Sequence, residues 1–200
     1  MQLIVATRNA HKTREIDQIL DSTVVVRDLT THPEIPEIPE TGESFEENAK
    51  LKAIAVSKQL PGLVIADDSG LEVEALKGAP GIHSARYAGP TASDKEKIAK
   101  LLRQLAKAGA KSDRRRARFR CVLAVAREGQ VLGLFEGIIE GKIAVQPRGL
   151  HGFGYDPIFI PDGFEETFAE LPEELKNTIS HRAKAIRQLQ TNLPTLCSEV

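Results

Sequence analysis

Two adjacent aspartates, Asp67 and Asp68, follow an apolar run in the segment VIADDSG (64–70). Side chains alternate between the two faces of a strand, so a regular strand cannot point both carboxylates into one cavity. A carboxylate at a strand end can ligate Mg²⁺ and activate water, as phosphoryl chemistry requires. The alternative is a turn in which both aspartates hydrogen-bond the backbone and stop the strand. We expect one of the two to carry the chemistry.

The segment TRNAHK (7–12) lies between an opening apolar run and a stretch with helical periodicity. It offers hydroxyl, amide and cationic groups at a helix N-terminus, where free N–H groups favour an anion such as a polyphosphate. The alternative is a polar loop in which Asn9 caps the helix and Lys12 is solvated. The chain contains neither GxxxxGK[S/T] nor GxGxxG, so no glycine-rich phosphate loop is present to decide between them.

Glu47 has two interpretations. It stands three residues after Ser44, the spacing of a capping box in which its carboxylate reaches back to the Ser44 amide. It could instead be a second carboxylate for a hard divalent cation, which commonly takes one or two protein oxygens when it is bound to a polyphosphate.

Glycines surround two aromatic residues in GLHGFGYDP (149–157). Glycine permits unusual dihedrals and close backbone approach, and an aromatic face can stack on a nucleobase. Asp156 could then meet the base edge or the sugar. The alternative is a glycine-rich turn in which Phe153 covers the core.

Two cationic groups of residues need an explanation. Lys176, His181 and Arg182 are expected to converge on the start of the last helix, which favours anions, although a solvated basic surface explains them equally well. The run RRRARFR (114–120) raises a nucleic-acid interpretation. We favour a solvated edge, because Arg118 and Arg120 share one strand face and acidic residues elsewhere cancel the charge.

The elements that must position these groups alternate between strand and helix periods. A proline every third residue, at Pro33, Pro36 and Pro39, indicates an exposed loop. We expect an α/β fold with a mixed sheet. The expected strands are 3–6, 21–29, 63–67 and a pair within 117–143 that turns near Glu128-Gly129 and continues past Gly137 and Gly141; the expected helices are 12–20, 44–60, 93–109 with Ser93, Glu96 and Gly109 as its signals, and 180–193 capped by Ser180.

Composition limits the class of protein. The 200 residues are 41% hydrophobic and 28% charged with a net charge of −1, which suits one domain, or two lobes sharing a core, and excludes a global attraction to nucleic acid or membrane. The start lacks a signal-peptide core, and no apolar run approaches the roughly 18 residues of a membrane span. Two cysteines make neither a disulfide framework nor a metal spacing, so we expect a cytoplasmic protein.

Six segments in order resemble one family, the inosine/xanthosine triphosphate pyrophosphatases. They are T-x-N-x-x-K (7–12), TGESFEENAKLKA, ADDSGLEV, GAPGIHSARYAG, HGFGYDPIF and KNTISHRAKA, and they span residues 7 to 185. The resemblance implies one domain over residues 1–200, with an elongated mixed sheet and flanking helices that form two lobes around a substrate cleft, related to the Maf fold. It also implies a Mg²⁺-dependent homodimer. Such an enzyme cleaves ITP, dITP or XTP to the monophosphate and pyrophosphate, which keeps these bases out of DNA and RNA.

The resemblance also implies roles by position. Asp68 would be the proton acceptor, and Glu47 and Asp68 would be the metal-linked carboxylates. Asp67, on the opposite strand face, would be a supporting residue. The substrate-binding positions would be Thr7, Arg8, Asn9, Ala10, His11, Lys12, Ser69, Phe153, Gly154, Tyr155, Asp156, Lys176, His181 and Arg182. Two other functions stay open: a Maf-type pyrophosphatase acting on pyrimidine or modified nucleotides, and a non-catalytic nucleotide or RNA binder.

Overall fold

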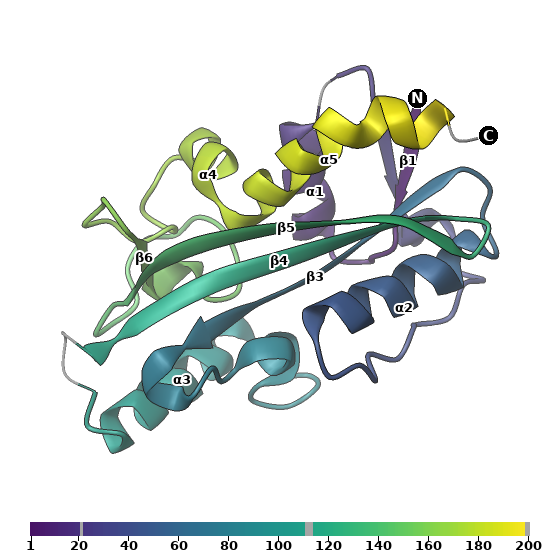
Figure 1. The fold of residues 1–200 in the computed structure, drawn as a ribbon. Coiled ribbons are helices and arrows are strands. Elements are labelled where there is room, and N and C mark those ends of the chain that lie inside the picture. Colours follow the sequence, from purple (N-terminus) through teal and green to yellow (C-terminus); the bar gives the residue numbers. More distant parts are fainter. Residues whose placement is uncertain (21, 111–113, 199–200) are drawn as a thin grey trace. The chain divides into compact units, whose positions relative to one another are not determined.

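The computed structural model describes residues 1–20, 22–110 and 114–198 (Figure 1). Its strands are β1 (Gln2–Val5), β2 (Val25–Asp28), β3 (Leu63–Val73), β4 (Arg116–Arg127), β5 (Gln130–Ile143) and β6 (Phe159–Pro161). Its α-helices are α1 (Ala10–Ile19), α2 (Phe45–Ser57), α3 (Asp94–Lys107), α4 (Glu173–Ile179) and α5 (His181–Ser198). Short 3₁₀ helices are Leu29–Thr31, Glu74–Leu76, Gly81–Arg86 and Asp156–Ile158.

The strands among the described residues form one sheet in the order β2-β1-β3-β4-β5-β6. β1 pairs in parallel with both β2 and β3, whereas β5 and β6 are antiparallel. The sheet is therefore mixed, and the α/β class expected from the sequence is confirmed. Residue 21, the first residue of the expected second strand, lies outside the described residues, and that strand begins at Val25.

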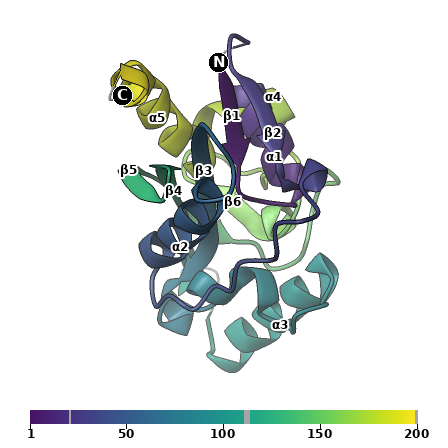
Figure 2. The same ribbon diagram turned by 90° about the vertical axis from the view of Figure 1, so that its right-hand side faces the viewer.

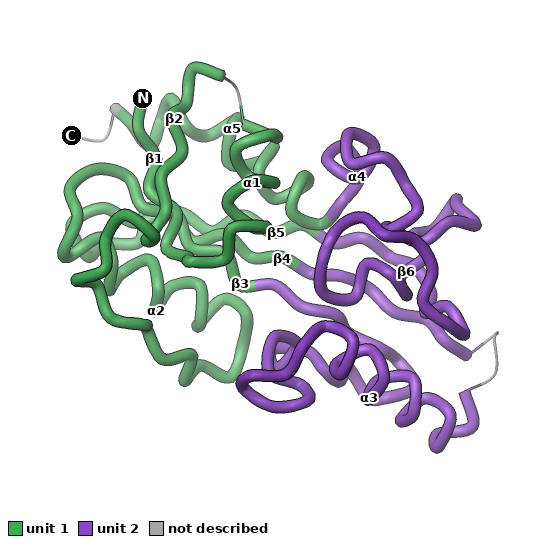
Figure 3. Tube along the Cα trace, turned by 180° about the vertical axis from the view of Figure 1, so that it is seen from behind, with its two compact units in different colours: residues 1–68, 121–137, 181–200 green, residues 69–120, 138–180 purple. Residues whose placement is uncertain are grey.

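The chain divides into two compact units (Figure 3). Unit 1 comprises residues 1–68, 121–137 and 181–200, and unit 2 comprises residues 69–120 and 138–180. Each unit has its own cluster of buried apolar side chains. Strands β3, β4 and β5 contribute residues to both units, so neither unit is a continuous piece of the sequence.

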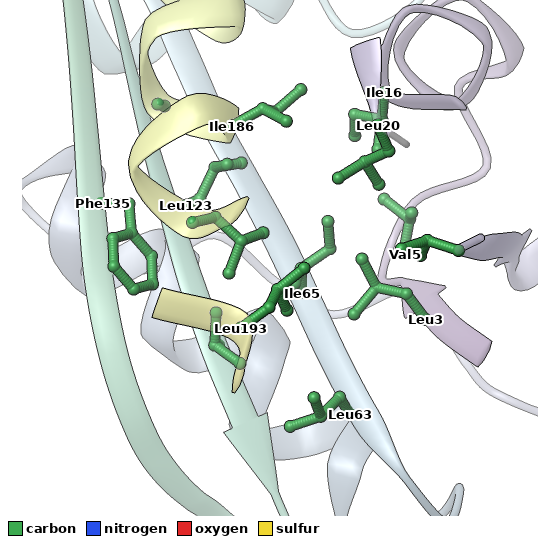
Figure 4. Close-up of a cluster of buried hydrophobic side chains, with 14 of the residues drawn as sticks. Leu3, Val5, Ile16, Leu20, Leu63, Ile65, Leu123, Phe135, Ile186 and Leu193 are labelled. Carbon is green, nitrogen blue, oxygen red and sulfur yellow. The ribbon is translucent and has the colours of Figure 1, made fainter. Parts of the chain in front are cut away.

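In unit 1, helices cover both faces of the strands. Helix α2 lies on one side of β3, and α1 and α5 lie on the other (Figures 1 and 2). Leu3, Ile65 and Leu123 from three strands pack with Ile16 of α1 and Ile186 of α5, all buried (Figure 4). Burial at about 25 cal/mol per Å² of apolar surface holds these helices to the sheet.

Unit 2 contains the helix that the sequence predicts best. Ser93 caps α3 in a capping box with Glu96, and Gly109, at φ +64°, follows its end, so these signals are confirmed. The buried core beneath it includes Phe119 and Phe159, whose ring centroids are 4.6 Å apart.

One local expectation is corrected. Strand β3 does not stop at Asp67 but continues through Ser69-Gly70 to Val73. The segment before the last helix forms a separate helix, α4, so Ser180 both ends α4 and precedes α5. Strand β5 continues past Gly137 and Gly141, as expected. The β4–β5 turn at Glu128-Gly129 is confirmed, with both residues at positive φ.

No described helix is long and apolar enough to cross a membrane.

Candidate active site

Asp67 is at the centre of a buried charge cluster in unit 1. Its side chain on β3 accepts a hydrogen bond from Arg182 Nε at 2.8 Å and forms an ion pair with Lys12 Nζ. The Arg182 guanidinium also pairs with Glu15 of α1. Lys12, Glu15, Asp67 and Arg182, here called the buried quartet, thus balance two cations with two anions. Burial alone would raise the pKa of Asp67, but Arg182 and Lys12 hold it well below its usual range.

A thiol completes the surroundings of Asp67. Cys121 Sγ lies 3.3 Å from Asp67 Oδ2. Burial, with the neighbouring Asp67 charge, raises the pKa of the Cys121 thiol well above its usual value. The thiol therefore stays neutral. Asp67 is thus in contact with two cations and a weak donor.

Asp68 lies on the opposite face of β3, as strand alternation predicts. Its Oδ1 accepts a hydrogen bond from Lys52 Nζ of α2 at 2.8 Å. The same ammonium group reaches Glu40 Oε1 at 2.9 Å and the Asp67 carbonyl oxygen at 2.9 Å. Lys52 therefore joins two carboxylates, Glu40 and Asp68, that lie far apart from it and from each other in the sequence.

Protonation of Asp68 is adjusted by burial. Loss of solvent raises the pKa of Asp68 to about 6, although Lys52 acts in the opposite direction. Burial would lower the pKa of Lys52, but the Asp68 and Glu40 carboxylates outweigh it and raise that pKa. Asp68 Oδ2 is buried and has no hydrogen-bond partner among the described residues. This oxygen can accept a proton near neutral pH.

Part of the segment 7–12 forms the N-terminal cap and the first residues of helix α1. Asn9 Oδ1 accepts hydrogen bonds from the amides of His11 at 3.0 Å and Lys12 at 3.3 Å, so Asn9 caps α1. The expectation of a solvated Lys12 is wrong, because its side chain is 17% exposed and bound to Asp67. Arg8 donates to the carbonyl oxygens of His32 and Ile35 in the proline-rich loop. Thr7 is half-buried, and Arg8 to His11 are exposed.

Glu47 is an exposed residue in the first turn of α2. Ser44 Oγ accepts from the Glu47 amide at 3.1 Å, as expected. The carboxylate, however, reaches the Glu43 amide at 2.7 Å rather than the Ser44 amide. The chain turns sharply before the helix, and a Cβ on Gly42 would lie 2.6 Å from the Glu47 Cβ. The helix start is thus a tight cap that leaves Glu47 on the surface.

The glycine-rich segment forms a closely held loop in unit 2. Asp156 Oδ2 accepts hydrogen bonds from the Phe153 amide at 2.8 Å and from Lys176 Nζ at 2.5 Å. Gly152 has φ +73°, and a Cβ there would lie 2.1 Å from the same oxygen. Lys176 Nζ also lies 5.0 Å from the centroid of the half-buried Phe153 ring. Asp156 is therefore turned inward, toward its own loop.

The expected cationic group at the last helix is divided between two helices. Lys176 is in α4 of unit 2, whereas His181 and Arg182 begin α5 in unit 1. All three are buried, so the solvated-surface alternative is wrong. A Cβ on Gly137 would lie 2.0 Å from the His181 carbonyl oxygen, which shows why β5 has a glycine where α5 begins. Ser69, the next residue after Asp68 in β3, is half-buried.

The basic run is not a free cationic track. The buried Arg115 donates to the carbonyl oxygens of Ile143 at 2.9 Å and Ala144 at 3.0 Å. Arg116 forms two hydrogen bonds with Asp162, and Arg118 pairs with Glu72. Carboxylates or carbonyls thus already engage these arginines, which disfavours the nucleic-acid interpretation.

The family model described as the Ham1 family matches residues 3–192. The chain belongs to the Ham1 family. It is 48% identical over 200 residues to the dITP/XTP pyrophosphatase of Listeria monocytogenes, covering 100% of this chain and 98% of that protein. It is 50% identical over 189 residues to the dITP/XTP pyrophosphatase of Geobacillus kaustophilus, covering 94% and 92%. A solved HAM1 protein from Coxiella burnetii matches with a TM-score of 0.86 and 42% identity, covering 98% and 99%. The resemblance inferred from the sequence is confirmed.

The structure of this Ham1 protein adds residues to the site that the sequence analysis missed. Lys52 and Glu40 join Asp68, and Glu15 joins Asp67. A signal for Lys52 was present, because it lies on the same face of α2 as the buried Ala49, Ala53 and Val56. A lysine on an apolar helix face requires a carboxylate partner. Glu40 gave no such signal, because it lies in the proline-rich loop.

Proposed function

We propose that this chain hydrolyses deaminated or otherwise non-standard purine nucleoside triphosphates, such as ITP, dITP and XTP, to the monophosphate and pyrophosphate. The observation that carries the proposal is the Asp68 carboxyl group, which is buried, with one oxygen bound to Lys52 and the other without a hydrogen-bond partner among the described residues. It lies in the ADDSG motif of a Ham1 chain whose relatives are named dITP/XTP pyrophosphatases. Hydrolysis of this kind would remove these nucleotides from the pool used for DNA and RNA synthesis.

In the proposed reaction, Asp68 takes a proton from the attacking water. The water oxygen forms a new bond to phosphorus, the anhydride bond between the α and β phosphates breaks, and the electron pair leaves with pyrophosphate. Asp68 suits this role because a general base works best when its pKa is near the working pH. Lys52 keeps Asp68 oriented and opposes the effect of burial on its pKa.

Mg²⁺ is the cation that the donor set fits best. Asp68 Oδ2 is a buried hard oxygen with no partner in the described chain, and Glu40 is joined to Asp68 through Lys52. A pair of carboxylates suits Mg²⁺, which takes one or two carboxylates and completes its coordination with water and phosphates. When bound, it would neutralise phosphate charge and activate water.

The second metal-linked carboxylate has two candidates. The resemblance assigns Glu47 beside Asp68, but Glu47 is exposed and one of its oxygens accepts from the Glu43 amide. Glu40 is half-buried and shares Lys52 with Asp68. Comparison of Mg²⁺ dependence in Glu40→Gln and Glu47→Gln decides between them: the variant with the larger rise in the Mg²⁺ concentration for half-maximal activity has lost the ligand.

The family resemblance supports the substrate contacts that we propose. Thr7 to Lys12 would bind the phosphates, with Ser69 beside the catalytic carboxylate, and Phe153 to Asp156 with Lys176 would form the wall against the base. Hypoxanthine and xanthine present O6 as an acceptor where adenine presents an amino donor. Donors such as His181, Arg182 or backbone N–H groups facing O6 would be left unpaired against adenine, which discriminates strongly.

The experiment is a product assay with ITP, XTP, dITP, ATP and dTTP plus Mg²⁺, for the wild type and Asp68→Ala. We expect pyrophosphate from the first three substrates, and a folded Asp68→Ala with activity lowered by at least about 10²-fold. Release of inorganic phosphate alone, or preference for ATP, contradicts the proposal. Preference for dTTP indicates a Maf-type enzyme instead.

The homodimer and the cytoplasmic location stay predictions, and sedimentation equilibrium tests the former.

A further inference from the structure

The loop from Gly152 to Asp156 is held from outside as well as from within. Within the loop, the Phe153 amide donates to Asp156 Oδ2. From outside, the Gly154 amide donates to Asp94 Oδ2 at 2.7 Å, across 60 residues of sequence. Asp94 is the first residue of α3 and belongs to unit 2, like the loop. No motif in the sequence connects these two positions.

The two amide bonds act on the peptide planes at either side of Phe153. The Phe153 N–H belongs to the preceding peptide plane, and the Gly154 N–H belongs to the following one. Because the two backbone dihedrals of a residue relate its two flanking planes, fixing both planes fixes Phe153 itself. The direction of its Cα–Cβ bond, and so the position from which the ring projects, depends on Asp156 and Asp94 together.

The loop needs such anchors because of its glycines. Gly152 and Gly154 have φ of +73° and +62°, and glycine loses more conformational freedom on ordering than any other residue. Tyr155, the residue after Gly154, holds the loop through its side chain. Its hydroxyl donates to the Ser84 carbonyl oxygen at 2.9 Å. Burial raises the pKa of Tyr155, and the nearby charge of Asp94 adds to this shift. The tyrosine therefore remains a neutral donor.

The two oxygens of Asp94 contact different groups. Oδ2 accepts from the Gly154 amide, and Oδ1 pairs with Lys97 Nζ at 2.7 Å, one turn along α3. Its side chain is 45% exposed. The carboxylate can therefore be changed without opening a core cavity, and the two contacts can be removed separately.

We propose that Asp94 is a positioning residue that fixes the Phe153 ring for stacking on the purine base, without itself touching the substrate. This inference rests on the proposed function, because it takes the Phe153 loop as the wall against the base. Base stacking is a binding interaction remote from the bond that breaks, so its loss acts mainly on KM.

The test compares three variants with ITP as substrate. Asp94→Ala removes the acceptor, and we expect KM to rise about fivefold to tenfold with kcat changed less than about twofold. Asp94→Asn keeps an acceptor oxygen for the Gly154 amide, so its KM should stay near that of the wild type. Lys97→Met removes the ion pair between Asp94 and Lys97 and should also leave KM near wild type.

These variants separate positioning from a role in the stability of α3. An acidic residue in the first turn favours the helix dipole, and Asp94→Asn loses that charge as Asp94→Ala does. If only helix stability mattered, both variants would raise KM equally, and that result overturns the inference. A wild-type KM in Asp94→Ala overturns it as well.

A measurement that does not depend on turnover tests the hydrogen bond of Asp94 separately from the proposed function. The ¹H–¹⁵N resonance of the Gly154 amide reports its hydrogen bond directly. We expect a large shift in Asp94→Ala and a small one in Lys97→Met. An unmoved resonance in Asp94→Ala refutes the anchor even if ITP is the substrate. If the resonance moves but the wild type releases no pyrophosphate from ITP, the proposed function fails and with it the stacking role, while the anchor itself stands.

Discussion

The two units hold their functional groups by different means. Unit 1 uses charge: four ionised side chains, of which Glu15, Asp67 and Arg182 are buried, balance one another, and Lys52 holds Asp68 on the other face of the strand. Unit 2 has a buried ion pair, Asp156 with Lys176, and relies mainly on backbone geometry: two glycines at positive φ and hydrogen bonds to peptide amides shape the loop around Phe153. Charge holds reactive groups in a given protonation state, whereas backbone bonds hold a shape. Damage to unit 1 should therefore lower kcat and stability, and damage to unit 2 should raise KM.

The largest effect on stability is expected from Asp67→Asn. The change leaves the partly exposed Lys12 and the buried Arg182 with Glu15 as the remaining anion of the quartet. Breaking a buried charge pair costs about 3–5 kcal/mol in the free energy of unfolding. Urea unfolding measures this loss, and the double variant Asp67→Asn/Lys12→Met, which restores the balance, should recover part of it. Equal stability of the single and double variants would argue against charge as the organising force.

The next largest effect is expected from a substitution in the Gly152–Asp156 loop of unit 2. A Cβ in Gly152→Ala would lie 2.1 Å from Asp156 Oδ2, and the residue has φ +73°. We expect KM for ITP to rise at least about tenfold, because the displaced carboxylate no longer holds Phe153. Gly163→Ala is the matched control, since Gly163 has φ +88° and open space around its Cβ. It should show a backbone strain of about 1 kcal/mol in stability and little change in KM.

A smaller effect concerns the pKa of Asp68. Lys52 lowers this pKa against the effect of burial, so Lys52→Met should raise it above about 6. Proton acceptance needs ionised Asp68, so the acid limb of the kcat/KM profile should move to higher pH in the variant. ¹³C NMR titration of the Asp68 carboxyl carbon in Mg²⁺-free protein measures the pKa directly. A downward shift would mean that Lys52 does not act on Asp68 through charge.

The smallest effect is expected at the basic run. Arg118 is 44% exposed and pairs with Glu72, and exposed ion pairs contribute little. Arg118→Ala should change the free energy of unfolding by less than about 1 kcal/mol and leave ITP hydrolysis intact. If the wild type binds RNA in a salt-dependent way and this variant does not, the result supports the nucleic-acid interpretation. It would also argue against separate roles for the two units.

The sequence predicted local structure better than contacts. The capping box of α3 and the opposite faces of Asp67 and Asp68 follow from rules that act over a few residues, and both are confirmed. The expected end of the strand at Asp67 was wrong, because pairing within the sheet overrides the weak strand preference of Ser69 and Gly70.

The missed residues share one cause. Glu40 reaches Lys52 from a loop whose path no periodicity describes, and Asp94 reaches Gly154 across 60 residues. Such pairs depend on how distant elements pack, and a single sequence does not encode this in any local pattern. Lys52, in contrast, could have been identified from a local pattern, because it lies on the apolar face of α2.

The buried quartet also limits when unit 1 can fold during synthesis on a ribosome. Asp67 and its partner Arg182 are 115 residues apart, and Arg182 begins the last helix. Until that helix has left the exit tunnel, Asp67 has Lys12 but lacks Arg182, and Glu15 lacks the same guanidinium. Closing the core earlier would bury these two carboxylates without Arg182, which is costly. Nearly the whole chain must therefore be made before the Asp67 side of β3 can pack, and folding of unit 1 becomes a late event in translation.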